Sequence, residues 1–337
     1  MPRKARIDAP GALHHIIVRG IEKKPIFRDV VDRKDFLNRL GAILLDTETS
    51  CYAWVLMRNH IHLLLRTGLV PIATVMRRLL TGYAVSFNHR YRRHGHLFQN
   101  RYKSFLCEEQ LYLKELVRYI HLNPLRAKAV TDINHLKRYA FCGHSVLMGK
   151  HKKDWQDCQY VLRLFGESVS AARRSYGAYV AEGVSQGRRL DLVGGGLVRS
   201  VGGWSVLKGL RGSGPRIKGD ERILGSSDFV ERVLKEANEQ LEQRLQLDAS
   251  GPGLDELIGK VAVTFDLSVD DLKTSSKHRR IVQARAVLCY LAVRKLWFSC
   301  ADVARRLNIS PNTVSMAVSR GQKIEDIKTI QKQLLGI

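Results

Sequence analysis

The 337-residue sequence lacks the marks of a membrane or secreted protein. No apolar run approaches the roughly 20 residues that a membrane-spanning helix needs. The N-terminal residues Met-Pro-Arg-Lys-Ala-Arg have no apolar core of the kind found in a signal peptide. No Cys-x-x-Cys pair occurs, which argues against a zinc knuckle or a disulfide framework and predicts reduced thiols. The six cysteines are Cys51, Cys107, Cys142, Cys158, Cys289 and Cys300. These absences favour a cytoplasmic, nucleoid-associated protein.

Acidic residues are also scarce relative to basic ones. Asp and Glu number 32 against 56 Lys and Arg, and the formal net charge is +24. Such an excess predicts a polyanionic partner, either nucleic acid or an acidic membrane surface. Because no membrane-spanning run is present, nucleic acid is the favoured partner. The length favours two or three domains, and a hydrophobic content of 45% is ample for their cores.

The first 148 residues alternate between strand and helix patterns. The strand patterns cover residues 13–19, 51–57, 60–66 and the second half of 90–106, and the helical patterns cover 29–45, 71–91 and 108–130. Pro124 is expected to end or kink the last of these helices. The order predicts an α+β domain over residues 1–148, with helices packed on an antiparallel sheet.

Beyond residue 148 the sequence becomes helical and then irregular. Residues 149–182 predict a helical extension of the first domain. Glycine clusters and frequent cations predict a flexible basic linker over residues 183–253, with one helix near 228–246. Residues 254–337 show helical patterns without strand-like alternation, which predicts an all-α domain.

His60 and His62 flank Ile61 in the third predicted strand. Side chains alternate between the faces of a strand, so the two imidazoles are expected to point the same way and to form half of a metal site. Two structural histidines held by hydrogen bonds are the alternative. His14 and His15 are adjacent in the first strand, so they are expected to face opposite ways and not to act together as such a pair.

A second group of polar residues lies on the predicted helix 108–130. Tyr119 and Asn123 are four residues apart and are expected to share one helical face. A phenol beside a metal site is suited to nucleophilic attack on a phosphodiester. Asparagine oxygen is a hard ligand that suits Mg²⁺ or Mn²⁺. The alternative is a packed aromatic residue and a helix-terminating cap. His121, two residues after Tyr119, is expected to point elsewhere.

Three motifs together resemble those of the REP-associated tyrosine transposases, which belong to the HUH single-tyrosine transposases of single-stranded insertion sequences. They are Met57–Leu64 with its His-Ile-His core, Gly95–Arg101 and Tyr119–Pro124, and they occur in the family's order. The resemblance covers roughly residues 8–148 and implies a ferredoxin-like fold. It also implies that His60 and His62 bind the metal, that Tyr119 is the nucleophile, and that Asn123 takes the place of the third ligand.

The reaction implied by this resemblance is DNA cleavage and joining by transesterification. Tyr119 would form a 5′-phosphotyrosine link and leave a free 3′-OH, on single-stranded DNA near a small REP-like hairpin. The site would be completed within one chain or between the two subunits of a homodimer. The segment 90–106 mixes cations with aromatic residues, as phosphate contact and base stacking require. The alternative interpretation of this composition is a solvated basic loop. The candidates in this segment are Arg90, Arg92, Arg93, Phe98, Arg101, Tyr102 and Lys103.

Residues 299–323 have the pattern of a helix-turn-helix, with a turn at Asn308–Pro311. A plain helical hairpin is the alternative. The start of the second helix would meet base edges and its end would meet phosphates of duplex DNA. The residues concerned are Asn312, Thr313 and Ser315 for the bases and Arg320 and Lys323 for the phosphates.

Residues 261–286 resemble the DNA-binding domain of the replication initiator DnaA. The resemblance implies a basic loop containing Lys277, Arg279 and Arg280, followed by a long helix whose Arg285 enters the minor groove. Ser-Pro-Asn-Thr at 310–313 departs from the initiator's Arg-Asp-His-Thr, so the initiator's own duplex site is not implied. No Gly-x-x-x-x-Gly-Lys-Ser/Thr loop occurs, and an ATPase is not implied either.

Two hypotheses of different classes follow from the sequence. The first is a metal-dependent, tyrosine-linked DNA nuclease and strand-transferase attached to a reader of duplex DNA. The second is a DNA-binding regulator whose N-terminal domain binds hairpins without cutting them. The set of His60, His62, Tyr119 and Asn123 favours the enzyme. A two-metal phosphatase or nuclease is disfavoured because Asp and Glu do not cluster.

Overall fold

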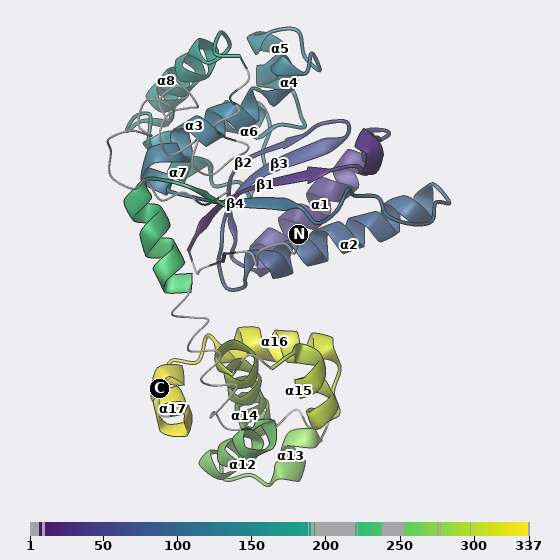
Figure 1. Cartoon of the computed structure of the whole chain (residues 1–337), viewed down its shortest axis with the longest axis vertical. Helices are drawn as coiled ribbons and strands as arrows, with labels where there is room; N and C mark the ends of the chain where they lie inside the picture. The colour runs from purple at the N-terminus through teal and green to yellow at the C-terminus, as the bar shows by residue number, and fades with distance from the viewer. Residues whose placement is uncertain are drawn as a thin grey trace, which may run out of the picture. The chain divides into compact units, whose positions relative to one another are not determined.

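A computed structural model of the chain describes residues 7–8, 11–187, 189, 192, 220, 222–237, 253–274, 276, 278–296 and 298–335. The chain divides into two compact units, Met1–Val233 and Leu234–Ile337, which are described separately below (Figure 1). No helix within the described ranges is both long and apolar enough to cross a membrane. All six cysteines are free thiols.

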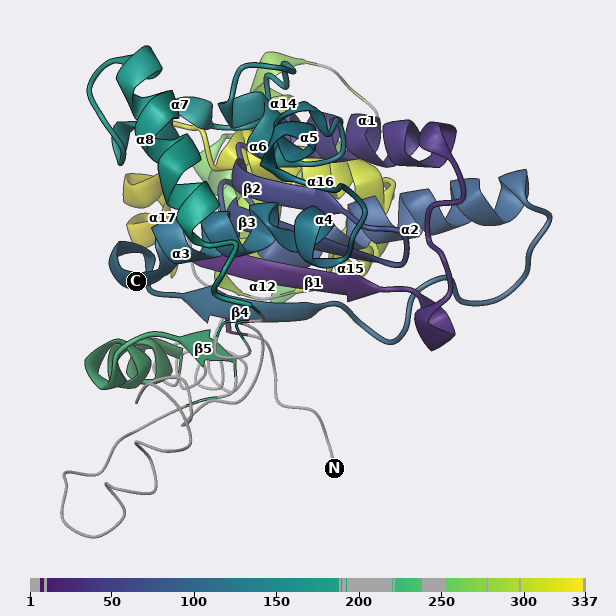
Figure 2. The same cartoon turned by 90° about the horizontal axis from the view of Figure 1, so that it is seen from above.

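The first unit is built on a five-stranded sheet in the order β2-β3-β1-β4-β5. Strands β1 (Leu13–Arg19), β2 (Ser50–Leu56), β3 (His60–Arg66) and β4 (Lys103–Cys107) pair antiparallel. The short strand β5 (Ile223–Leu224) joins the outer edge of β4 in parallel, as Figure 2 shows. The predicted α+β fold with a mainly antiparallel sheet is therefore confirmed.

Helices cover both faces of this sheet, which explains why its strands are apolar on both sides. Helices α1 (Val30–Asp46) and α2 (Ile72–Arg90) bury one face, where Ile61 of β3 packs. Helix α3 (Glu109–His121) lies on the other face, where Leu64 packs. The short helices α5 (Ile133–Arg138), α6 (Gly143–Leu147) and α7 (Cys158–Arg163) and the longer α8 (Val169–Glu182) surround α3.

The predicted helix 108–130 is interrupted, as Pro124 led us to expect. Helix α3 ends at His121, and a separate short helix, α4, runs from Asn123 to Arg126. Proline lacks an N–H group and its ring conflicts with the carbonyl four residues earlier, so the helix cannot continue through Pro124. The Asn123 side chain instead donates hydrogen bonds to the carbonyl oxygens of Tyr119 and Ile120, at 2.9 and 3.2 Å.

The predicted linker 183–253 is only partly covered by the structure, because residues 193–219 and 238–252 lie outside the described residues. Residues 222–233, which we assigned to this linker, belong to the first unit and include β5. A helical segment occupies residues 227–237, inside the helix predicted at 228–246. The predicted domain boundaries stay predictions.

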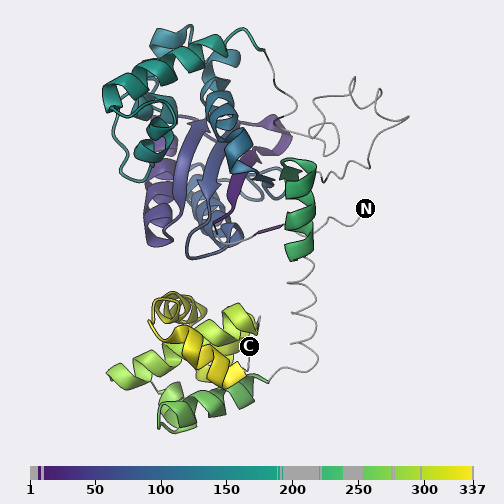
Figure 3. The same ribbon diagram turned by 90° about the vertical axis from the view of Figure 1, so that its left-hand side faces the viewer.

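The described residues of the second unit are helical, and Figure 3 shows its helices in green to yellow. They are α12 (Leu254–Thr264), α13 (Val269–Lys273), α14 (Arg279–Tyr290) with a wider turn at Leu291–Lys295, α15 (Cys300–Leu307), α16 (Pro311–Gly321) and α17 (Ile327–Leu335). Asn308 ends α15 in the left-handed conformation, and the Ser310 side chain caps α16 by accepting from Thr313 N–H. The predicted helix-turn-helix is present.

Candidate active site and nucleic-acid interface

His60 and His62 lie on one face of β3, as the strand alternation predicted. In the antiparallel ladder with β1, His60 is opposite Arg19 and His62 is opposite Ile17. The two imidazole centroids are 5.3 Å apart. His62 has only 2% of its surface exposed, whereas His60 is half-buried at the end of the strand.

Both histidines use Nδ1 for a hydrogen bond. Nδ1 of His60 lies 2.8 Å from Oδ1 of Asn59, and Nδ1 of His62 lies 3.0 Å from Nε2 of His15. Neither Nε2 atom has a hydrogen-bond partner among the described residues. These two atoms on neighbouring same-face rings are therefore the ones available to bind a cation.

The surroundings also keep both imidazoles neutral. Burial, with a smaller effect of the Arg19 charge, lowers the pKa of His60 to about 4. Burial lowers the pKa of His62 well below its usual range, and the neighbouring His15 and His60 add to this effect. A neutral imidazole is the form that binds metal, so neither ring has to lose a proton near neutral pH.

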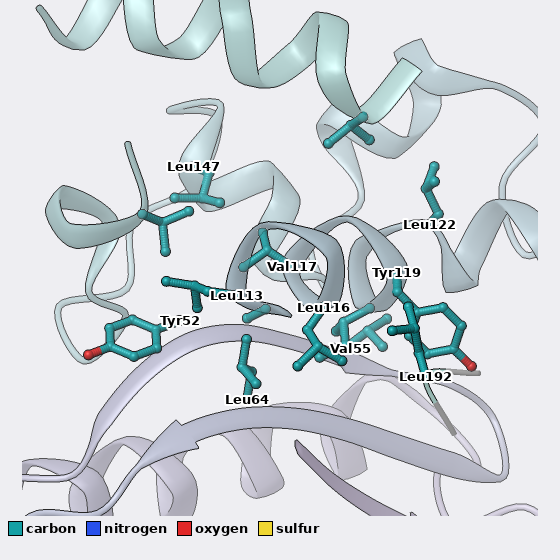
Figure 4. Close-up of a cluster of buried hydrophobic side chains, with 14 of the residues drawn as sticks. Tyr52, Val55, Leu64, Leu113, Leu116, Val117, Tyr119, Leu122, Leu147 and Leu192 are labelled. Carbon is teal, nitrogen blue, oxygen red and sulfur yellow. The ribbon is translucent and has the colours of Figure 1, made fainter. Parts of the chain in front are cut away.

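Tyr119 faces these histidines from α3. Its ring centroid lies 5.9 Å from that of His62, in an edge-to-face arrangement. Only 7% of Tyr119 is exposed. Figure 4 shows its ring at the edge of the buried cluster beside Leu192, with the hydroxyl oxygen directed away from Leu116. The structure therefore brings the predicted nucleophile and the predicted metal-binding pair together across the sheet–helix interface.

Arg126 is a neighbour of Tyr119 that our sequence reasoning missed. Its guanidinium carbon lies 5.2 Å from the Tyr119 ring centroid, and its Nη1 donates to the Tyr119 carbonyl oxygen at 3.3 Å. Burial lowers the pKa of Arg126. No carboxylate within the described part of the chain forms an ion pair with it. Its position two residues after the motif Tyr119–Pro124 was the available signal.

Asn123 requires a correction. We expected it to share a helical face with Tyr119, but Leu122 separates α3 from α4 and Asn123 begins the second helix. Its Nδ2 caps the end of α3, which is the role that we gave as the alternative. Its Oδ1 has no hydrogen-bond partner among the described residues and is the atom that could bind a cation. Its role as third ligand stays a prediction.

Nothing in the sequence placed His15 in the site, because it and its neighbour His14 are expected to face opposite ways and so not to form a metal-binding pair. The structure shows that its relevant neighbours are on other elements: its ring stacks on His62 and meets Tyr119 edge-on. His121 points elsewhere, as expected, and its Nδ1 lies 2.7 Å from the hydroxyl of buried Tyr176. The sequence held no local signal for His15, because its contacts depend on how distant strands pair.

The predicted donor set consists of two neutral imidazoles, those of His60 and His62, and the amide oxygen of Asn123. Within the described ranges, no cluster of three or more His, Cys, Asp or Glu residues could hold a metal ion. A site with few protein ligands suits Mg²⁺ or Mn²⁺, which commonly shares its coordination with substrate phosphate and water. The residues present therefore fit the predicted cation, while structural zinc would need a fuller set of ligands.

The predicted phosphate-contacting arginines of the first unit differ in their availability. Arg90 forms ion pairs with Asp29 and Asp32, so a phosphate would compete with these two carboxylates, and its predicted phosphate contact stays a prediction. Arg92 and Arg93 line a surface hollow together with Asn88, His89 and His94.

The remaining candidates of this segment differ in exposure. Arg101 and Lys103 are exposed. Phe98 and Tyr102 are partly buried against the cluster under α1 and α2, so only part of each ring is open to a base.

The second unit presents part of the predicted duplex-binding surface. Asn312, Thr313 and Ser315 are exposed in the first turns of α16, as are Arg320 and Lys323 near and after its end. Arg279 and Arg280 are exposed at the start of α14, whereas Lys277 lies outside the described residues.

Arg285 is held by backbone carbonyl groups in this structure. Its guanidinium is half-buried and donates to the carbonyl oxygens of Leu272 and Ser276 at 2.9 and 3.0 Å, and to those of Asp271 and Thr274. These four hydrogen bonds attach the end of α13 and the following loop to α14, and the predicted entry of Arg285 into the minor groove stays a prediction.

Comparisons with known proteins find one family match in each of the two units. Residues 10–123 match the family described as transposase IS200 like, and residues 254–320 match the family described as bacterial DnaA protein helix-turn-helix. The chromosomal replication initiator protein DnaA of Ureaplasma parvum serovar 3 (strain ATCC 700970) is 32% identical over 81 residues, which is 24% of this chain and 18% of that protein.

A solved structure of a REP-associated tyrosine transposase bound to a REP hairpin covers 46% of this chain and 91% of its own, at 17% identity and a TM-score of 0.36. Residues 10–123 are thus similar to an IS200-like transposase domain, and residues 254–320 are similar to a DnaA-type helix-turn-helix domain.

Proposed function

We propose that the protein is a metal-dependent single-stranded DNA endonuclease and strand-transferase that acts on hairpin-associated DNA. One observation carries the proposal: Tyr119 of α3 and His62 of β3 face each other with ring centroids 5.9 Å apart, inside a domain of the IS200-like transposase family. A tyrosine nucleophile beside a pair of neutral imidazoles is suited to phosphoryl transfer.

The proposed reaction is a transesterification on one DNA strand. The Tyr119 hydroxyl oxygen forms a bond to a backbone phosphorus, and the bond between that phosphorus and the 3′-oxygen breaks. The phenolic proton is lost from Tyr119, and a proton ends on the departing 3′-oxygen as a free 3′-OH. The phosphate stays on Tyr119 as a 5′-phosphotyrosine. Attack by a 3′-OH reverses the step and rejoins DNA without ATP, because the number of phosphoester bonds is conserved.

The surrounding residues have distinct proposed roles. His60, His62 and Asn123 would hold Mg²⁺ or Mn²⁺, which when bound polarises the phosphate oxygens. Arg126 places a positive charge at the Tyr119 ring, where it favours an incoming phosphate. The packing of Tyr119 against the apolar cluster holds its ring in one place before DNA binds.

The test is to detect the covalent intermediate. The full chain is incubated with single-stranded hairpin DNA from the sequence flanking its own gene, labelled at the 3′ end, with Mg²⁺ or Mn²⁺. We expect a labelled protein band in a denaturing gel, absent in Tyr119→Phe and strongly reduced in His62→Ala, with hairpin binding retained in both.

Tyr112→Phe, which removes a hydroxyl from the same helix, is the matched control and should still form the adduct. An adduct that survives Tyr119→Phe, or no adduct on any such hairpin, would refute the proposal.

A non-catalytic, hairpin-binding regulator is the second candidate function. It is favoured by the burial of Tyr119, which has only 7% of its surface exposed and lies beside Leu192. The same assay separates the two functions, because the regulator binds the hairpin without forming an adduct.

We further propose that the helix-turn-helix domain binds duplex DNA through the exposed first turns of α16 and the exposed arginines at the start of α14. The experiment is selection of bound sequences from a random duplex library by the full chain. Loss of sequence preference in Asn312→Ala, with non-specific binding retained, is the expected result. An unchanged preference would remove Asn312 from the base-reading set.

A further inference from the structure

His15 of β1 connects the two halves of the candidate active site. It is fully buried. Its Nε2 lies 3.0 Å from Nδ1 of His62, and the two rings are stacked with centroids 5.3 Å apart and planes inclined by 23°. Its ring also meets Tyr119 edge-on, at a centroid distance of 6.1 Å. His15 therefore touches both a predicted ligand and the predicted nucleophile.

The sheet register explains this contact. Strand β1 runs antiparallel to β3 with Ile17 opposite His62, so His15 is the diagonal neighbour of His62 on the same face. On its other side β1 pairs with β4, where Phe105 lies opposite His15 with a ring-centroid distance of 6.1 Å. The His15 ring is therefore enclosed by side chains of β3, β4 and α3.

The hydrogen bond between the two rings joins Nε2 of His15 to Nδ1 of His62, and the tautomers of the two rings set which atom is the donor. A cation can bind Nε2 of His62 only when that atom is deprotonated, and the ring proton of a neutral imidazole is then on Nδ1. The Nδ1–H group in turn needs an acceptor, because it is buried. Nε2 of His15 is the acceptor in reach.

We propose that His15 is a positioning residue for the metal site. It accepts the hydrogen bond from Nδ1–H of His62 and thereby keeps Nε2 of His62 deprotonated and fixed in direction. It does not itself bind the cation. This inference rests on the proposed function, because it takes His60 and His62 as ligands.

Binding of Mn²⁺ alone tests the proposal without any DNA cleavage. The free Mn²⁺ signal is followed by electron paramagnetic resonance while the full chain is titrated. Loss of an outer-shell partner of a metal-ligating histidine costs roughly 10–100-fold in metal affinity. We expect His15→Leu, which fills the space without an acceptor, to weaken Mn²⁺ binding by about this factor. His15→Gln, whose side-chain oxygen can accept, should recover most of the affinity.

The neighbouring residue offers a matched control. His14 is also fully buried in β1, but it lies on the opposite face, where its Nδ1 is 3.1 Å from the Ser104 hydroxyl. His14→Leu should leave the Mn²⁺ dissociation constant unchanged. Thermal melting of both leucine variants reports any loss of folding. Nitrogen-15 NMR of labelled histidines reports the tautomer directly: His62 should be the Nδ1–H form in the wild type and lose that preference in His15→Leu.

The outcomes separate this inference from the proposed function. If His60→Ala and His62→Ala lose Mn²⁺ binding but His15→Leu does not, the role of His15 is overturned and the metal site stands. If His60→Ala and His62→Ala bind Mn²⁺ like the wild type, the proposed metal site fails. If His14→Leu and His15→Leu lose the same Mn²⁺ affinity and show the same fall in melting temperature, lost packing is the cause and the role of His15 is overturned.

Discussion

Replacing Arg285 with alanine is expected to destabilise the helical unit and not to remove a DNA contact. In the structure the guanidinium donates to the carbonyl oxygens of Leu272, Ser276 and Asp271 at 2.9, 3.0 and 3.2 Å, and also to that of Thr274. These carbonyls belong to the last turn of α13 and the loop after it, where the helix leaves its acceptors unsatisfied. Without Arg285 this loop loses its attachment to α14.

The size of the effect can be worked out from these contacts. A hydrogen bond to a charged group contributes about 1.5–3 kcal/mol net, and bonds that share one partly exposed guanidinium do not add. We therefore expect a loss of about 2–3 kcal/mol in the free energy of unfolding. In a domain of roughly 60–100 residues, 1 kcal/mol moves the melting temperature by about 4–8 °C, which gives a fall of about 8–24 °C.

Scanning calorimetry of the full chain measures this shift, with duplex binding followed over a range of salt concentrations. Arg280→Ala is the control, because Arg280 is exposed and, among the described residues, forms one ion pair, to Asp266 at 3.1 Å. Such a pair contributes about 0–1 kcal/mol, so the control should melt almost like the wild type. In Arg280→Ala, the slope of log duplex affinity against log salt concentration should become less steep by about 0.9. If Arg285→Ala melts like the wild type and lowers that slope instead, Arg285 contacts DNA and our reasoning is wrong.

Three further predictions concern the first unit. Burial lowers the pKa of His144 to about 3, below the value of 6.5 that is ordinary for an unfolded chain. Between pH 3 and pH 6.5 the unfolded state therefore binds more protons than the folded state, and the free energy of unfolding should fall as the pH falls through this range. His144→Gln should flatten this dependence in urea unfolding at several pH values, and an equally steep dependence would contradict the assignment. Arg101→Ala should lower the salt slope for single-stranded hairpin binding by about 0.7 without changing the melting temperature, and an unchanged slope would exclude a phosphate contact. A Cβ at Gly143 would lie 2.8 Å from Nε2 of His121, so Gly143→Ala should destabilise the unit by about 1–3 kcal/mol in urea unfolding. A Cβ at Gly259 would meet no atom of the described residues within 4 Å beyond its own helix backbone, so Gly259→Ala should not destabilise the protein. Equal losses of stability in both variants would argue against steric overlap at Gly143.

The local parts of the structure could be predicted because they depend on short-range periodicity. Strand alternation put His60 and His62 on one face, and the rings are indeed neighbours on β3. The turn signals at Asn308 and Ser310 located the helix-turn-helix, because a left-handed C-cap and a serine N-cap each act within a few residues. Such signals need no knowledge of which elements meet.

The parts that could not be predicted depend on pairing between distant segments. His15 reaches His62 only because β1 lies between β3 and β4, an order that no single segment encodes. Composition pointed to Arg90 and the resemblance to DnaA pointed to Arg285 as candidate DNA contacts, but neither signal identified the partners of these arginines within the protein. Arg90 pairs with aspartates at the start of α1, and Arg285 with the carbonyls at the end of α13.

The short strand β5 has a consequence for isolating the first unit, Met1–Val233. A version ending at Glu182, where α8 ends, would lack the segment that caps the outer strand. The N–H groups of Leu106 and Glu108, which now donate to the carbonyls of Arg222 and Leu224 at 2.9 and 2.8 Å, would become an open sheet edge. Open edges recruit strands from other molecules, so the shorter version should self-associate and precipitate, while one that extends through Val233 should remain dispersed.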